Sequence, residues 1–275
     1  MKNIKLCIFD LDGTLLNSNK EITERTLNSI KKLRECGINY TIATGRIDML
    51  ARKYQRQIQS NLPIISCNGS LIRDMNNKVH YMKTLDFKTV ECIFHFFNSL
   101  NIDFLFYSEN LILATKNNPR RKFLENYNTT AREEDKCEIE ILNDNIEKYS
   151  DTKFLKSLAY IQNRKKLLET QVLLTENFKN LSIVSSDYKL LDIMPPKITK
   201  GSGVQNLCNI LNISKDEVCV FGDNFNDLEM IEFAGTSIAP SNAEENIKNI
   251  STYVTKSNDE DGVAFAIEEF ILKNV

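Results

Sequence analysis

The hydrophobic pattern divides the chain into regular outer parts and a less regular middle. Short apolar runs at Lys5–Asp10, Asn39–Ala43 and Pro63–Cys67 have the length and β-rich composition of buried strands. The segments between them, Glu21–Cys36 and Ile47–Gln59, carry apolar residues at helical spacing. This alternation of strand and helix predicts an α/β fold with a doubly wound, Rossmann-like parallel sheet.

The middle of the chain, residues 83–190, is richer in charge and contains no catalytic motif that we recognise. It has a predicted helix at Asp86–Leu100 with aromatic residues on one face, and several strand candidates. Strand–helix alternation resumes near Thr199 and includes a strand at Glu217–Phe221. We therefore expect residues 1–82 and 191–275 to form one catalytic core, and residues 83–190 to form an inserted α/β cap domain.

Composition narrows the possible partners. The formal net charge is -2 and the pI about 5.9, so the totals give no indication of a surface for nucleic acid. No apolar stretch approaches the ~20 residues that span a bilayer, and we expect a cytoplasmic protein without a membrane partner. The seven cysteines include no CxxC pair, and this pattern is typical of small core residues in a reducing compartment.

Two acidic residues follow the first predicted strand. Asp10 and Asp12 lie at its carboxyl end, the edge at which open α/β sheets bind ligands. Residues two apart on an extended chain face the same way, so both carboxylates can approach one pocket. Two close carboxylates repel each other unless a cation lies between them, and oxygen-only ligands favour Mg²⁺. A solvated strand end followed by a turn is the structural alternative.

Three further groups follow a strand or precede a helix. Asp223 and Asp227 follow the strand that ends at Phe221, and Asp227 could equally be the N-cap of the next helix. The hydroxyl of Thr44, after the second strand, could donate to a phosphate oxygen. Lys200 could supply the cation that a phosphoryl group needs during transfer.

Together these motifs resemble those of the haloacid dehalogenase superfamily. The four matching segments are DLDGT at Asp10–Thr14, TGR at Thr44–Arg46, KG at Lys200–Gly201 and GDNFND at Gly222–Asp227. The inserted middle resembles in position and length the large α/β cap of the Cof-like phosphatases in that superfamily. Asn68-Gly69 and the segment from Ser241-Asn242-Ala243 to Ala264 are also similar to that subgroup.

The resemblance implies a magnesium-dependent phosphatase that acts on small phosphorylated metabolites, with sugar phosphates as the expected class. Asp10 would be the nucleophile that forms an aspartyl-phosphate, and Asp12 the general acid and base. The implied phosphate and substrate contacts come from Leu11, Thr44, Gly45, Arg46, Asn68, Lys200 and Asn226. The implied magnesium ligands are Asp10, Asp12 through its backbone carbonyl, Asp223 and Asp227.

Several alternatives remain open on the sequence. Lys197 could replace or assist Lys200, although only Lys200 precedes a glycine. The same motifs would serve a phosphotransferase or mutase that passes the phosphoryl group to a sugar. A non-enzymatic receiver domain also uses strand-end acids around Mg²⁺, but receivers lack the Asp-x-Asp spacing and the cap. The sequence names neither the substrate nor the oligomeric state.

Overall fold

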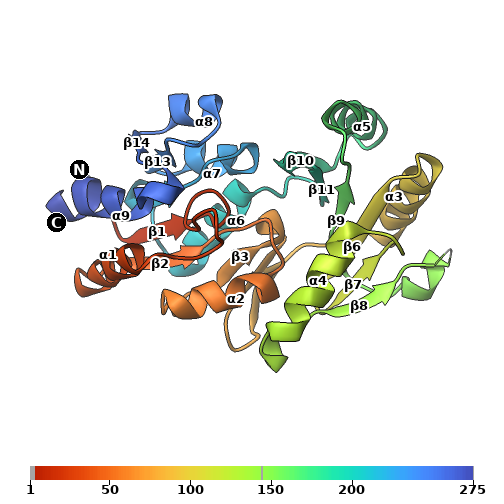
Figure 1. Cartoon of the computed structure of the whole chain (residues 1–275), viewed down its shortest axis with the longest axis horizontal. Coiled ribbons are helices and arrows are strands. Elements are labelled where there is room, and N and C mark those ends of the chain that lie inside the picture. Colours follow the sequence, from red (N-terminus) through yellow and green to blue (C-terminus); the bar gives the residue numbers. More distant parts are fainter. Residues whose placement is uncertain (1–3, 144, 275) are drawn as a thin grey trace. The chain divides into compact units, whose positions relative to one another are not determined.

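The computed structural model describes residues 4–143 and 145–274 and consists of two compact units (Figure 1). The first unit contains the chain up to Tyr81 and from Thr199 onward, and the second runs from Met82 to Ile198. The first unit carries every motif residue named above. The function of the second as a cap stays a prediction.

A five-stranded parallel sheet forms the centre of the first unit, in the order β14-β13-β12-β1-β2. A parallel bridge between Ala43 and Ile65 adds β3 next to β2. The chain leaves β1 towards β2 on one side and returns to β12 on the other, so the strand order reverses at β1. The strands are β1 (Leu6–Phe9), β2 (Asn39–Ile42), β3 (Ile64–Ser66), β12 (Val218–Phe221), β13 (Thr236–Pro240) and β14 (Tyr253–Thr255).

Helices cover both faces of this sheet, and residues of β1 alternate between two hydrophobic cores. Cys7 and Phe9 pack with side chains of α1, α2 and α9, whereas Leu6 and Ile8 pack with side chains of α6, α7 and α8. A strand buried on both faces needs the continuous apolar sequence seen here. The helices are α1 (Glu24–Glu35), α2 (Asp48–Gln57), α6 (Lys200–Leu211), α7 (Leu228–Phe233), α8 (Glu245–Ile250) and α9 (Gly262–Ala266), which continues to Asn274 in π- and 3₁₀-helical turns.

The second unit is built on a six-stranded sheet in the order β10-β11-β9-β6-β7-β8, mostly antiparallel. The aromatic face of α3 packs on this sheet, and the ring of Phe97 lies 5.2 Å from that of Phe104. The elements are β6 (Asp103–Ser108), β7 (Leu111–Ala114), β8 (Glu138–Ile141), β9 (Phe154–Tyr160), β10 (Ser182–Asp187) and β11 (Leu190–Met194), with helices α3 (Phe87–Ser99), α4 (Pro119–Thr130) and α5 (Arg164–Asn177).

The predicted α/β class is confirmed, and the elements that sequence reasoning overlooked lie mainly in less regular parts. A short three-stranded sheet joins β3 to β4 (Leu71–Arg73), with which β3 pairs antiparallel, and then to β5 (Val79–Met82). Helix α4 was not predicted because Leu124 is its one fully buried side chain, so its apolar spacing is weak. No helix in the two described stretches is long and apolar enough to cross a bilayer.

Candidate active site

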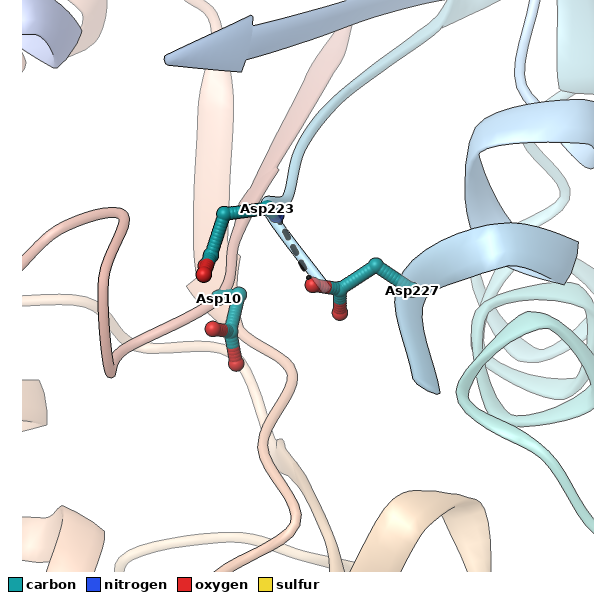
Figure 2. A group of neighbouring side chains, drawn as sticks. All are labelled: Asp10, Asp223 and Asp227. Carbon is teal, nitrogen blue, oxygen red and sulfur yellow. Dashed lines mark hydrogen bonds between the residues drawn. The ribbon is translucent and has the colours of Figure 1, made fainter. Parts of the chain in front are cut away.

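Three carboxylates meet at the carboxyl edge of the parallel sheet. Asp10 follows β1 and Asp223 follows the neighbouring β12 after Gly222, so the register of the two strands brings both acids to one place. Asp227 comes from the turn that precedes α7. One oxygen from each carboxylate lies within 4.8 Å of the others, and Figure 2 shows the three side chains directed into the same small region. The carboxylates therefore lie at the carboxyl ends of β1 and β12, next to the point where the strand order reverses.

Lys200 lies among these carboxylates. It is the first residue of α6, whose N-cap Thr199 forms a reciprocal capping box with Ser202. The ammonium group is buried and donates to Oδ1 of Asp10 and to Oδ1 of Asp227, both at 2.6 Å. Lys197, the alternative cation, is exposed. The contacts therefore favour Lys200 as the cation of this site.

The cluster carries more negative than positive charge, and its pKa values reflect this. Burial raises the pKa of Asp10 well above its usual range; Asp227 and Asp223 raise it further, against the opposing effect of Lys200. Burial, followed by the charge of Asp227, raises the pKa of Asp223 to about 7. Burial alone would lower the pKa of Lys200, but Asp10 and Asp227 outweigh it and hold that pKa above its usual range. One ammonium thus leaves three carboxylates, two of them buried and that of Asp223 partly buried, incompletely neutralised.

Asp227 uses its carboxylate to organise the loop before it. Its Oδ2 accepts the backbone N–H of Asp223 at 2.9 Å, the dashed line in Figure 2. The same oxygen accepts the backbone N–H of Asn224 at 3.0 Å. Its side chain makes no capping hydrogen bond to α7, so the N-cap interpretation of its carboxylate is not realised. A Cβ atom on Gly222 would lie 2.7 Å from the side chain of Asp227, so a glycine at this strand end allows Asp227 to pack against the backbone there.

Asp12 lies outside the carboxylate cluster and is held by cations. Arg46 donates to both oxygens of Asp12, through Nε and Nη2, each at 2.7 Å. Lys20 donates to Oδ1 at 2.9 Å. Burial alone would raise the pKa of Asp12, but Arg46 and then Lys20 outweigh it and hold that pKa well below its usual range. Arg46, expected at the phosphate, therefore pairs with the expected general acid here.

The remaining predicted phosphate contacts come together around the turn after β3. Thr44 is buried and accepts a hydrogen bond from the N–H of Arg46 at 3.1 Å. Asn226 donates to Oδ1 of Asn68 at 3.1 Å, and a Cβ on Gly45 would lie 3.0 Å from that same oxygen. The side chain of Leu11 is fully buried, so only its backbone could contact a ligand.

Sequence reasoning missed a contact of Thr14, although Thr14 belongs to the first motif. The hydroxyl of Thr14 donates to Oδ1 of Asp223 at 2.6 Å. Gly13, at φ +86°, lies so close that a Cβ would be 2.4 Å from Oδ2 of Asp223. The loop after β1 and the loop after β12 are thus in direct contact.

Comparison with known proteins supports the inference from this geometry. The family model of haloacid dehalogenase-like hydrolases matches residues 7–267. The chain belongs to this family. It is 30% identical to the Bacillus subtilis 5-amino-6-(5-phospho-D-ribitylamino)uracil phosphatase YwtE in an alignment of 284 positions that covers 98% of each chain. It is 28% identical to the B. subtilis phosphatase YwpJ, covering 98% of this chain and all of that one.

A solved structure of a haloacid dehalogenase-like hydrolase from B. subtilis has the same fold as this chain. The two superpose with a TM-score of 0.85 at 27% identity, covering 98% of this chain and 100% of that one. The family and these relatives identify the chain as a hydrolase of the phosphatase type, and they favour the enzyme over the receiver-like alternative.

Proposed function

We propose that the first unit hydrolyses small phosphate monoesters with Mg²⁺, through a phosphoryl group carried on Asp10. The observation that supports this best is the placement of the Asp10 carboxylate, buried at a strand end between Lys200 and Asp223. A carboxylate attacks a phosphate dianion poorly unless cations reduce the repulsion between them. An ammonium 2.6 Å from Asp10 supplies one such cation.

The donor set fits a hard divalent cation. Oxygen atoms of Asp10, Asp223 and Asp227 lie within 4.8 Å of one another, and carboxylate oxygens are the ligands that Mg²⁺ favours. Asp10 and Asp223 would hold the ion with the backbone carbonyl of Asp12, and Asp227 would support them by fixing Lys200 and the Asp223 loop. When bound, the ion supplies charge that offsets the repulsion between the nucleophile and the phosphate.

The proposed reaction has two halves. An oxygen of Asp10 attacks phosphorus, the ester bond breaks, and Asp12 gives its proton to the leaving oxygen. In the second half Asp12 takes a proton from water, whose oxygen attacks phosphorus and releases the carboxylate of Asp10. Lys200 stays on Asp10, while Thr44 and Asn226 would hold the phosphoryl oxygens.

The pairing of Asp12 with Arg46 adds a requirement to this scheme. Asp12 must carry a proton before it can donate one, yet Arg46 and Lys20 hold its pKa well below the usual range. The scheme therefore requires Arg46 to leave Asp12, or a substrate group to replace it, before the ester bond breaks.

The proposed substrates are small, phosphorylated polyols or sugars. The name of YwtE gives it a substrate with a phosphorylated ribityl chain, and we extend that class to this chain. The second unit would act as a cap that selects among such esters. A panel of phosphorylated metabolites would rank sugar phosphates against nucleotides, flavin phosphates and pyridoxal phosphate.

The test uses purified full-length protein and an aryl phosphate. We expect hydrolysis with Mg²⁺, none with a chelator, and none with Asp10→Asn. Asp216→Asn, an exposed aspartate of the same unit, is the matched control and should keep full activity. An unchanged rate for Asp10→Asn would show that the nucleophile is wrongly assigned. Phosphate transferred to an added sugar, and not to water, would favour the mutase alternative.

A further inference from the structure

The loop that follows Asp12 is held in place by residues from near the end of the chain. The carbonyl of Gly13 accepts a hydrogen bond from Nδ2 of Asn242 at 2.9 Å, across 229 residues of sequence. The carbonyl of Leu16 accepts one from Nδ2 of Asn258, also at 2.9 Å. Ser18 donates to Asp259 twice, from its N–H at 2.7 Å and from its hydroxyl at 2.6 Å.

Asn242 joins three segments at once. While its Nδ2 donates to Gly13, its Oδ1 accepts the backbone N–H of Asn258 at 2.9 Å, so both ends of its amide are used. Two residues further along, the N–H of Glu244 donates to the carbonyl of Asp223 at 2.9 Å. The short stretch from Asn242 to Glu244 therefore contacts both the loop of Asp12 and the loop of Asp223.

The position of Gly13 matters because there is little space beside it. A Cβ at Gly13 would lie 2.4 Å from the carboxylate of Asp223, and Thr14 donates to that carboxylate at 2.6 Å. A small shift of this loop would therefore lengthen the Thr14 bond or push on Asp223. The carbonyl that Asn242 binds is also one peptide away from that of Asp12, which is a predicted metal ligand.

We propose that Asn242 is a positioning residue of the metal site. It binds the Gly13 carbonyl and holds the loop of Asp12 at a fixed distance from Asp223, and Asn258 and Asp259 hold the far end of that loop. In this role Asn242 acts through its hydrogen bond to the Gly13 carbonyl. The predicted effect on metal binding rests on the proposed function, whereas the anchoring of the loop does not.

The test compares Asn242→Asp with Asn242→Ala and with a control on the adjacent exposed residue, Ser241→Ala. Aspartate keeps the acceptor for Asn258 but has no N–H for Gly13. Amide hydrogen exchange of the metal-free protein reports on the loop through Leu15 and Leu16, whose N–H groups donate to Asp10 and Leu11. Calorimetric titration with Mg²⁺, and kcat and KM for an aryl phosphate, complete the comparison.

In both Asn242 variants the Leu15 and Leu16 amides should exchange at least about 3–10-fold faster, as loss of the hydrogen bond to the Gly13 carbonyl implies. The exchange rates of the amides in β1 and β12 should be unchanged. The Mg²⁺ Kd should rise at least roughly threefold, because the same hydrogen bond is lost. The kcat should fall with little change in the KM for substrate. Ser241→Ala should match the wild type in all of these.

The anchoring would be refuted by loop exchange equal to that of the wild type, or by exchange raised equally throughout the unit. An unchanged Mg²⁺ Kd in a variant with a loosened loop would equally refute the link to the metal site. A wild-type protein that neither binds Mg²⁺ nor hydrolyses the aryl phosphate would refute the proposed function, while the exchange comparison would still decide the anchoring.

Discussion

Replacing Lys200 by methionine removes the ammonium group that lies between two buried carboxylates. Lys200 Nζ is 2.6 Å from Asp10 and 2.6 Å from Asp227, and all three side chains are at most 6% exposed. Removing one partner of a buried ion pair costs about 3–5 kcal/mol, because the remaining charge has lost its partner and cannot reach water. Methionine keeps most of the side-chain volume, so this cost reports on charge more than on packing.

The effect should depend on pH. The pKa of Asp10 is already raised by burial, and losing Lys200 raises it further, so the carboxyl group can escape the penalty by taking a proton. Lys200→Met should therefore destabilise the metal-free protein by about 3–5 kcal/mol at pH 8 and by less at pH 5. Activity should fall by roughly a factor of 100–1,000, as it does when an electrostatic stabiliser is removed.

Urea unfolding in the presence of a chelator measures this difference. The chain has no tryptophan, so far-ultraviolet circular dichroism is the appropriate signal. Lys197→Met is the matched control: Lys197 is exposed, and its replacement should change stability by less than about 0.5 kcal/mol. If Lys200→Met is as stable as the wild type at pH 8, or if Lys197→Met loses as much activity, the reasoning about this charge cluster is wrong.

Three further predictions concern the neighbouring groups. Because the pKa of Asp223 is raised to about 7, a proton competes with the metal below that pH. Calorimetry should therefore show Mg²⁺ binding that weakens from pH 8 to pH 6, and pH-independent binding would contradict this. Arg46→Met removes the two hydrogen bonds that Arg46 donates to Asp12 and raises the pKa of Asp12. Because Asp12 must be protonated to donate to the leaving oxygen, the alkaline limb of the kcat/KM profile should move to higher pH, and Lys20→Met should move it less; equal shifts would count against the bidentate pair. Gly13→Ala should cost about 1–2 kcal/mol from its positive φ alone, measured by urea unfolding, and should weaken Mg²⁺ binding by crowding Asp223.

The strand-end acids were predictable because strand periodicity and the geometry of parallel sheets decide where they lie. Asp10 and Asp223 follow apolar runs, and parallel pairing of those runs brings their ends to one edge. Lys200 was predictable only jointly with these acids, since a lone lysine before a helix is usually solvated. The burial of Lys200 between Asp10 and Asp227 depends on how α6 packs against the sheet. That packing cannot be predicted from a single sequence.

The contacts that the sequence did not reveal depend on loop conformation. Arg46 and Asp12 lie 34 residues apart, and nothing in either motif indicates that they pair. From the sequence, the carboxylate of Asp227 could either cap α7 or serve the carboxylate cluster. In the structure it accepts the N–H of Asp223 in the preceding loop and makes no capping hydrogen bond to α7. Asn242 belongs to a segment that resembles the Cof-like subgroup, but the sequence does not indicate that it donates to the carbonyl of Gly13.

The central claim is that Asp10 itself carries the phosphoryl group. The most direct measurement is acid quenching of the full-length enzyme during turnover of an aryl phosphate with Mg²⁺, followed by peptide mass spectrometry. The account predicts a phosphoryl group on the peptide that contains Asp10, absent from Asp10→Asn and from enzyme treated with a chelator. A phosphoryl group on another residue, or none at all while hydrolysis proceeds, would contradict it.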